Sequence, residues 1–176
     1  MNKQAATWIL QAEGGLVDNP NDPGGVTKYG ISKAAFPDLD IPSLTPEQAI
    51  SIYATHYWEP AKCPALPANL ALVHFDAAVN CGVGQAARFL QHAVGVTVDG
   101  IVGPLTIAAA WKAPEAIGAY FSVREAFYRR LAQANPAEGV FLQGWLNRLA
   151  NLKAFLAQAA SSSVCAGDPG LQAGEG

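Results

Sequence analysis

The segment from about Ala68 to Asn80 most limits how this chain can fold, because it reads as a helix that is apolar nearly all round. Its apolar side chains are Leu70, Leu72, Val73, Phe75, Ala77 and Val79. A helix without a polar face is stable only when other elements cover it on every side. We therefore expect a mainly α fold built around this central buried helix.

Size, composition and charge favour one compact domain. The 176 residues are 51% hydrophobic and 14% charged, where a typical charged share is roughly 25%. The net charge of −3 gives the molecule no electrostatic attraction to nucleic acid. Residues 81–160 carry seven basic and four acidic side chains. This mildly basic half is more often a solvated helix face than a surface for docking on an anionic envelope.

The remaining hydrophobic patterns predict several more helices and one small sheet. Residues 2–13 form a predicted helix, and the glycine-rich segment 14–31 is predicted to be a loop with a small hairpin or sheet. A helix begins at the Thr45 cap, with Pro46 and Gln48 in favoured positions, and runs to about Tyr57. Further helices are predicted over residues 85–94, 105–111, 114–133 and 138–159, before a small polar tail over 161–176.

Metal binding and membrane insertion find no support in the sequence. The three cysteines and three histidines show no spacing typical of a zinc site, so we expect free thiols and neither a metal nor an organic cofactor. The N-terminus is too weakly basic and apolar for a secretory signal peptide, and no apolar run is long enough to span a bilayer. We expect no stable membrane insertion.

The strongest chemical signal is Glu13-Gly14-Gly15 at the end of the first predicted helix. Glycines beside a carboxylate leave room for a polymer to approach it, and glycosidic cleavage needs an acid that still carries its proton near neutral pH. Apolar neighbours such as Trp8 desolvate the acid and favour its protonated form. Asp22, nine residues on, could stay ionised across a cleft. Spacing alone leaves a structural role for Glu13 equally open.

The ordered series of motifs resembles glycoside hydrolase family 108, a group of bacterial and phage lysozymes. The resemblance covers about residues 4–157 and ends in a region similar to a peptidoglycan-binding part. It is carried by Glu13-Gly14-Gly15, Asp22–Ile31, Gly30-Ile31-Ser32, Ile52-Tyr53, Tyr57-Trp58, Phe75–Asn80, Leu90-Gln91, Val98–Pro104 and Gly144-Trp145.

The resemblance implies a fold, a domain division and an activity. The fold would be a lysozyme-like helical domain with a small β element after the first helix. Residues 1–94 would form the catalytic region, 95–160 a peptidoglycan-binding helical subdomain packed on it, and 161–176 a polar tail. The implied activity is N-acetylmuramidase hydrolysis of the β-1,4 bond between N-acetylmuramic acid and N-acetylglucosamine, with Glu13 as the catalytic acid.

A looser similarity to phage-type lysozymes suggests the partners of Glu13. Those enzymes space Glu, Asp and Thr by nine and six residues, and the offsets from Glu13 to Asp22 and from Asp22 to Thr27 are nine and five. Asp22 and Thr27 would position water or stabilise the cationic sugar. Asp18 is the competing second carboxylate, ranked behind Asp22, and otherwise a substrate contact.

Two further residues are candidates for binding the sugar, and three arginines for binding the peptides. Tyr29 and Asn80 carry hydroxyl and amide groups suited to N-acetyl-hexosamines. Asp76, in the same helix as Asn80, is expected to pair internally. Arg124, Arg129 and Arg130 could bind peptide stems, although a solvated helix face is the preferred interpretation.

The biological setting follows from the resemblance as a set of expectations. Such a protein would act as a monomeric phage or prophage endolysin, stay in the host cytoplasm until a holin-type partner releases it, and then act on bacterial peptidoglycan in the periplasm. The alternatives are a lytic transglycosylase, and a non-catalytic peptidoglycan-binding or secretion-accessory protein that uses residues 99–104. Whether the anomeric carbon is inverted or retained depends on the separation of the two carboxyl groups.

Overall fold

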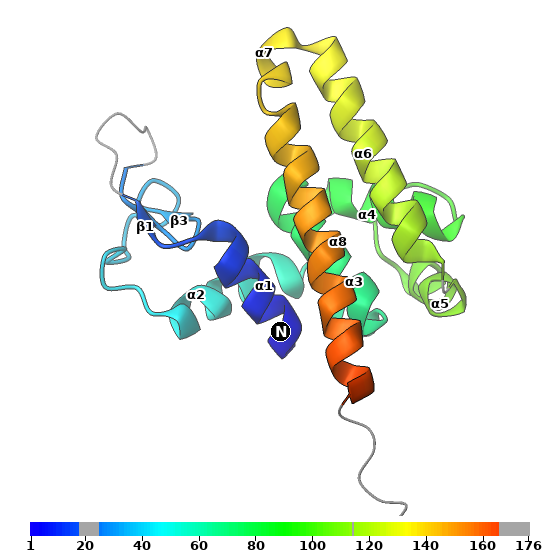
Figure 1. The fold of residues 1–176 in the computed structure, drawn as a ribbon, viewed down its shortest axis with the longest axis horizontal. Helices are drawn as coiled ribbons and strands as arrows, with labels where there is room; N and C mark the ends of the chain where they lie inside the picture. The colour runs from blue at the N-terminus through cyan, green and yellow to red at the C-terminus, as the bar shows by residue number, and fades with distance from the viewer. Residues whose placement is uncertain (18–24, 114, 166–176) are drawn as a thin grey trace, which may run out of the picture.

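The chain is built around α3 (Ala68–Cys81), as its apolar sequence predicts (Figure 1). The computed structural model describes residues 1–17, 25–113 and 115–165. Every residue from 70 to 78 is buried, including the polar side chains of His74 and Asp76. The mainly α fold is therefore confirmed, and the polar groups inside α3 need partners from the elements around it.

The elements that cover α3 come from both ends of the chain. It packs against α1, α4 and α6 and against the two short helical turns that precede it. The bounds of the helices are α1 (Lys3–Glu13), α2 (Pro46–Tyr53), α4 (Val83–Val94), α5 (Pro104–Lys112), α6 (Ala116–Ala134), α7 (Pro136–Gly139) and α8 (Leu142–Cys165), with a π-helical turn at Ala54–Trp58 and a 3-10 turn at Cys63–Ala65.

The expected small β element follows α1. Strands β1 (Leu16–Val17), β2 (Thr27–Lys28) and β3 (Ile31–Ser32) form an antiparallel sheet in the order β1-β2-β3. Two residues, Tyr29 and Gly30, join β2 to β3, with φ angles of +52° and +72°. Positive φ at both central residues is typical of the tight hairpin turns whose twist matches that of the strands.

The helix predicted from Thr45 begins with the expected cap. The Thr45 hydroxyl accepts from the Gln48 backbone N–H, and the Gln48 side chain accepts from the Thr45 backbone N–H. The α-helix ends at Tyr53, four residues before the predicted end, and continues as the π-helical turn. This wider turn brings Trp58 into the core, edge-on against Phe75.

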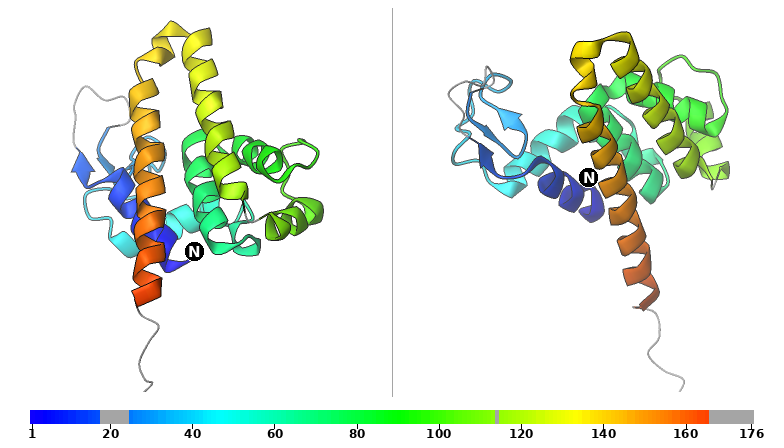
Figure 2. Two further views of the ribbon diagram at one scale, coloured as in Figure 1. Left: turned by 45° about the vertical axis from the view of Figure 1, so that its right-hand side comes forward. Right: turned by 45° about the horizontal axis from the view of Figure 1, so that its top comes forward.

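Helices α6 and α8 form a long antiparallel pair joined through α7 (Figure 2). The sequence predicted one helix over 138–159. Instead Asn135 caps the separate short helix α7 by accepting from the Ala137 N–H, and α8 starts at Leu142. At its other end α8 continues to Cys165, six residues beyond the predicted end, and so takes in residues 161–165 of the predicted polar tail. Among the described residues, no helix combines the length and apolar character needed to cross a membrane.

Candidate active site

Glu13 is the last residue of α1, where the backbone turns sharply toward the sheet. Gly14 follows with a φ of +76°, a conformation that favours glycine. The Glu13 side chain keeps 20% of its surface exposed. The glycine after Glu13 thus ends the helix and leaves the carboxyl at the junction of α1 and the sheet, partly open to solvent.

The turn between β2 and β3 presses against this carboxyl. A Cβ atom added to Gly30 would lie 2.7 Å from Glu13 Oε2 and 2.6 Å from the Tyr53 hydroxyl. The Tyr53 hydroxyl donates to the Tyr29 carbonyl at 2.8 Å. Burial and then the charge of Glu13 raise the pKa of Tyr53 above its usual range. Only a glycine at position 30 allows this close approach.

Arg148 in α8 approaches the other oxygen of Glu13. Its Nη2 atom lies 2.8 Å from Glu13 Oε1 and 2.8 Å from Asp76 Oδ1, and its Nε donates to Asp76 Oδ1 at 2.9 Å. Nη2 thus forms ion pairs with both carboxylates. Arg148 is thus shared between the candidate acid and the buried core.

Asp76 is the fixed end of this charge network. Its Oδ2 accepts from Arg124 Nη1 at 2.6 Å, and its Oδ1 accepts from Trp8 Nε1 at 2.7 Å. Burial opposes ionisation of Asp76, but the charges of Arg124 and Arg148 outweigh it and lower its pKa. The expectation that Asp76 pairs internally is confirmed. Arg124 is also fully buried, so placing it on a solvated helix face was wrong.

A groove of about 570 Å³ lies between α1 and α8 and passes the end of α3. Its walls include the Trp145 ring and several side-chain amides. Side-chain amides and an aromatic face are the groups that hydrogen-bond and stack on N-acetyl sugars. The lining residues are Trp8, Gln11, Ala12, Asn80, Gly144, Trp145, Asn147, Arg148 and Asn151.

The structure brings some of the sequence-predicted site residues to this place. Asn80 lines the groove, and its Nδ2 donates to the Asp76 carbonyl at 2.7 Å. Tyr29 contributes its backbone to the turn against Glu13. Thr27 lies in β2, where its hydroxyl donates to the Gly25 carbonyl at 3.3 Å. The candidate carboxylates Asp18 and Asp22 lie outside the described residues.

Sequence reasoning did not single out Arg148, and it gave Trp145 no role at the sugar. Arg148 is 135 positions from Glu13, and no local spacing indicates that the two side chains meet. The one available signal was an arginine in the last, partly apolar helix, next to the Gly144-Trp145 motif. Pairing of this kind depends on the tertiary packing of α8 against α1.

The ion pair favours a structural role for Glu13, whereas the groove favours a catalytic one. A carboxylate locked into an internal ion pair with no groove beside it would have only a structural role. Glu13 does pair with Arg148, yet it stays partly exposed next to Ala12 and Arg148 on the groove wall. Glu13 is not itself a lining residue, but its chain neighbour Ala12 and its ion-pair partner Arg148 both line the groove. In the described part of the chain, no cluster of three or more His, Cys, Asp or Glu side chains could hold a metal ion.

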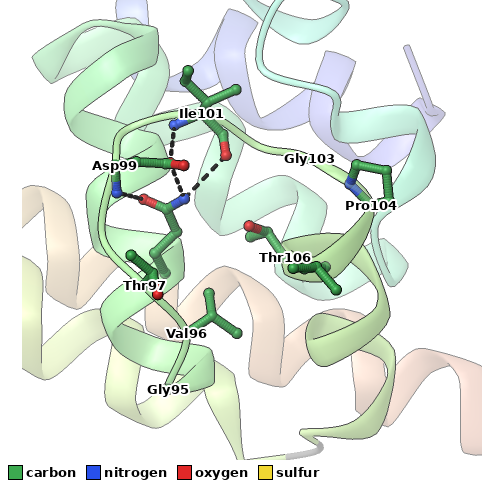
Figure 3. Close-up of a pocket in the computed structure, with 10 residues that line it drawn as sticks. Gly95, Val96, Thr97, Asp99, Ile101, Gly103, Pro104 and Thr106 are labelled. Atoms are coloured by element: carbon green, nitrogen blue, oxygen red, sulfur yellow. Dashed lines mark hydrogen bonds between the residues drawn. The ribbon is translucent and has the colours of Figure 1, made fainter.

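A separate pocket of about 540 Å³ lies at the junction of α4 and α5 (Figure 3). The buried Gln91 amide fixes the loop beside it. Gln91 Oε1 accepts from the Asp99 and Gly100 N–H groups at 3.1 and 2.9 Å, and Nε2 donates to Asp99 Oδ1 at 2.6 Å. The Asp99 carboxylate also accepts from the Ile101 N–H at 2.8 Å. Asp99 therefore stabilises the conformation of this loop, which is part of the Val98–Pro104 motif.

Two known families match consecutive segments of the chain. Glycosyl hydrolase 108 matches residues 6–82, and a predicted peptidoglycan domain matches residues 85–150. Among solved structures, that of Brucella abortus SagA is 32% identical in sequence with a TM-score of 0.71, covering 88% of this chain and 92% of that chain. No curated protein matches this chain.

The fold and the sequence matches place the chain among the lysozyme-like glycoside hydrolases. It belongs to the glycosyl hydrolase 108 family, with a predicted peptidoglycan domain on its C-terminal side. The family resemblance stated from the sequence is thereby confirmed. The two matches together support a peptidoglycan hydrolase whose substrate is the cell-wall polymer.

Proposed function

We propose that this protein is an N-acetylmuramidase and that Glu13 is its general acid. The observation that carries the proposal is the partly exposed Glu13 carboxyl, whose ion-pair partner Arg148 lines a groove together with Trp145 and side-chain amides. Glu13 would protonate the oxygen of the β-1,4 bond between N-acetylmuramic acid and N-acetylglucosamine as that bond breaks. The Trp145 face and Asn80 would hold the sugars in register.

The packing around Glu13 supports this role. Gly30 and Arg148 fix the two carboxyl oxygens from opposite elements, so the acid is held in one position before the glycan arrives. Such preorganisation raises the rate of proton transfer. Arg148 shares its charge with the fully buried Asp76, so its charge does not belong to Glu13 alone.

We assign the second carboxylate to Asp22, ahead of Asp18, and a supporting role at the reacting sugar to Thr27 and Tyr29. Water would attack the anomeric carbon with help from Asp22. The biological role proposed with this activity is that of a monomeric phage or prophage endolysin, released from the host cytoplasm by a holin-type partner. The division into regions 1–94 and 95–160, with a tail from 161, also stays a prediction.

The test is digestion of purified sacculi by wild type and by Glu13→Gln. We expect Glu13→Gln to lower the rate by at least about a hundredfold, because a general acid contributes on that order. Its melting temperature should stay close to that of wild type. Glu59→Gln, at an exposed position outside the groove, is the matched control and should remain active.

Mass spectrometry of the products separates the alternatives. New reducing muramic ends mean hydrolysis, whereas 1,6-anhydro ends mean that the muramic 6-hydroxyl attacked, as in a lytic transglycosylase. Binding to sacculi without release of any soluble fragment would indicate a non-catalytic protein. Equal loss of folding and activity in Glu13→Gln would contradict the catalytic role of Glu13.

A further inference from the structure

A second groove, of about 380 Å³, lies between α4 and α6. These helices are on the side of the molecule away from the β sheet (Figure 1). Residues spaced three or four apart on each helix form its two walls, as expected when two helices pack along one face. The lining residues are Gln85, Arg88, Phe89, His92, Ser122, Val123, Ala126 and Arg130.

The groove is open because small side chains face it from α6. Ser122 and Ala126 form one wall and leave space above the buried ring of Phe89. The exposed residues Arg88 and Arg130 also line this space. The groove thus combines an apolar floor with positive charge at its rim.

Within the described residues, neither of these arginines forms an ion pair. The ion pairs there engage Arg124 with Asp76 and Arg129 with Glu125, but neither Arg88 nor Arg130. Arg88 donates from Nη1 to the Gly84 carbonyl at 3.2 Å. Its guanidinium also packs on Gly100, where an added Cβ would lie 3.0 Å from the Arg88 Cζ. Packing on both sides restricts Arg88, and its charge adds to the Gln91 and Ile101 hydrogen bonds in lowering the pKa of Asp99.

We propose that this groove binds the anionic peptide stems of peptidoglycan. The inference rests on the proposed function and adds a second contact to the polymer, apart from the groove between α1 and α8. Stem peptides carry free carboxylates, and guanidinium groups bind carboxylates through paired, charge-assisted hydrogen bonds. Alanine side chains of the stem would lie over Phe89 and Ala126.

Two observations favour a peptide stem over another anionic polymer. All the lining residues fall inside residues 85–150, the segment that matches the predicted peptidoglycan domain. The protein has a net charge of −3, so its attraction for extended polyanions is weak except at local sites. A short, carboxylate-bearing peptide fits a groove with two separated cations and an apolar floor.

The test compares binding of variants in a Glu13→Gln background, which keeps sacculi intact. We expect the double variant Arg88→Gln/Arg130→Gln to bind intact sacculi about tenfold more weakly in cosedimentation, since charged hydrogen bonds are lost. Arg129→Gln removes a neighbouring charge that is already paired with Glu125, and should bind like the background protein. Both mutated positions of the double variant are exposed, so the fold should be retained.

The same proteins are then titrated with glycan strands freed of peptides by an amidase. The double variant should bind these strands as well as the background protein does. Equal weakening by Arg129→Gln would show an effect of net charge, and weakening on peptide-free strands would show that the groove binds sugar; either result overturns the proposal. The release of reducing ends by wild type, measured separately, decides the muramidase assignment regardless of this outcome.

Discussion

Two neighbours restrict the conformation of the Glu13 side chain. The Gly30 backbone lies against one carboxyl oxygen and the Arg148 guanidinium against the other. A side chain at position 30 would have to share the space of Glu13 and of the Tyr53 hydroxyl. The glycine is therefore required for contact as well as for its positive φ.

Replacing Gly30 by alanine should damage activity more than stability. The positive φ costs about 1–3 kcal/mol for a non-glycine residue, and the new Cβ displaces the Glu13 carboxyl, which can cost on the order of a hundredfold in rate. Gly95→Ala is the control, because Gly95 has the same φ of +72° but open space around it. Rate measurements on sacculi and thermal melts compare the two. Equal rates in both variants would show that the contact with Gly30 does not determine the position of Glu13.

Secondary structure that depends on local sequence was predictable, whereas contacts between elements far apart in the chain were not. The apolar pattern of α3, the Thr45 cap and the small sheet after α1 follow from local rules of periodicity, capping and turn formation. The same rules predicted a helix as far as Tyr57, whereas the α-helix gives way to a π-helical turn before that residue. They also predicted one helix where the structure has two, α7 and α8. Local sequence patterns indicate Glu13, but its partner Arg148 is known only once α8 packs on α1.

The contribution of α8 can be tested at Arg148. Arg148→Met leaves the buried Asp76 with one cation instead of two and should lower the free energy of unfolding by about 3 kcal/mol. Arg148→Lys keeps the charge and should restore much of the stability. It loses the planar fork, so kcat should remain reduced while KM changes little.

Lys153→Met, an exposed charge on the same helix, is the control and should stay within about 0.5 kcal/mol of wild type. Chemical denaturation and initial rates give the two quantities. If Arg148→Lys recovers full kcat, Arg148 acts through its charge and packing alone and does not orient Glu13.

At the scale of the molecule, the two family matches form one physical unit. The glycosyl hydrolase match ends at residue 82, yet the buried Asp76 within it is neutralised by Arg124 and Arg148 from the second match. His74 also links the two matched segments, through contacts between uncharged groups. Its Nδ1 lies 3.0 Å from the Tyr120 hydroxyl of α6, and its Nε2 lies 3.0 Å from the Ala61 carbonyl. We therefore expect the segment matched by glycosyl hydrolase 108 to need the helices of the second match for its stability.

This connection makes the whole protein sensitive to mild acid. Burial lowers the pKa of His74 from 6.5 to about 4. In the unfolded chain the His74 imidazole therefore binds a proton near pH 6.5, whereas in the folded protein it binds one only near pH 4. The contribution of His74 to stability is fully present above pH 6.5, and about 3 kcal/mol of it should be lost as the pH drops through this window. Asp76, whose pKa is lowered, adds a further loss only below its unfolded value near pH 4.

Denaturant unfolding at pH 7.0, 6.0 and 5.0 measures this slope. His74→Gln should be less stable than wild type at pH 7, because it disturbs the contacts to α6, but its stability should change much less between pH 7 and pH 5. His56→Gln, at an exposed position, controls for the loss of an imidazole. A wild-type slope that persists in His74→Gln would assign the acid sensitivity to other groups. It would also remove His74 as the acid-sensitive link between the two matched segments.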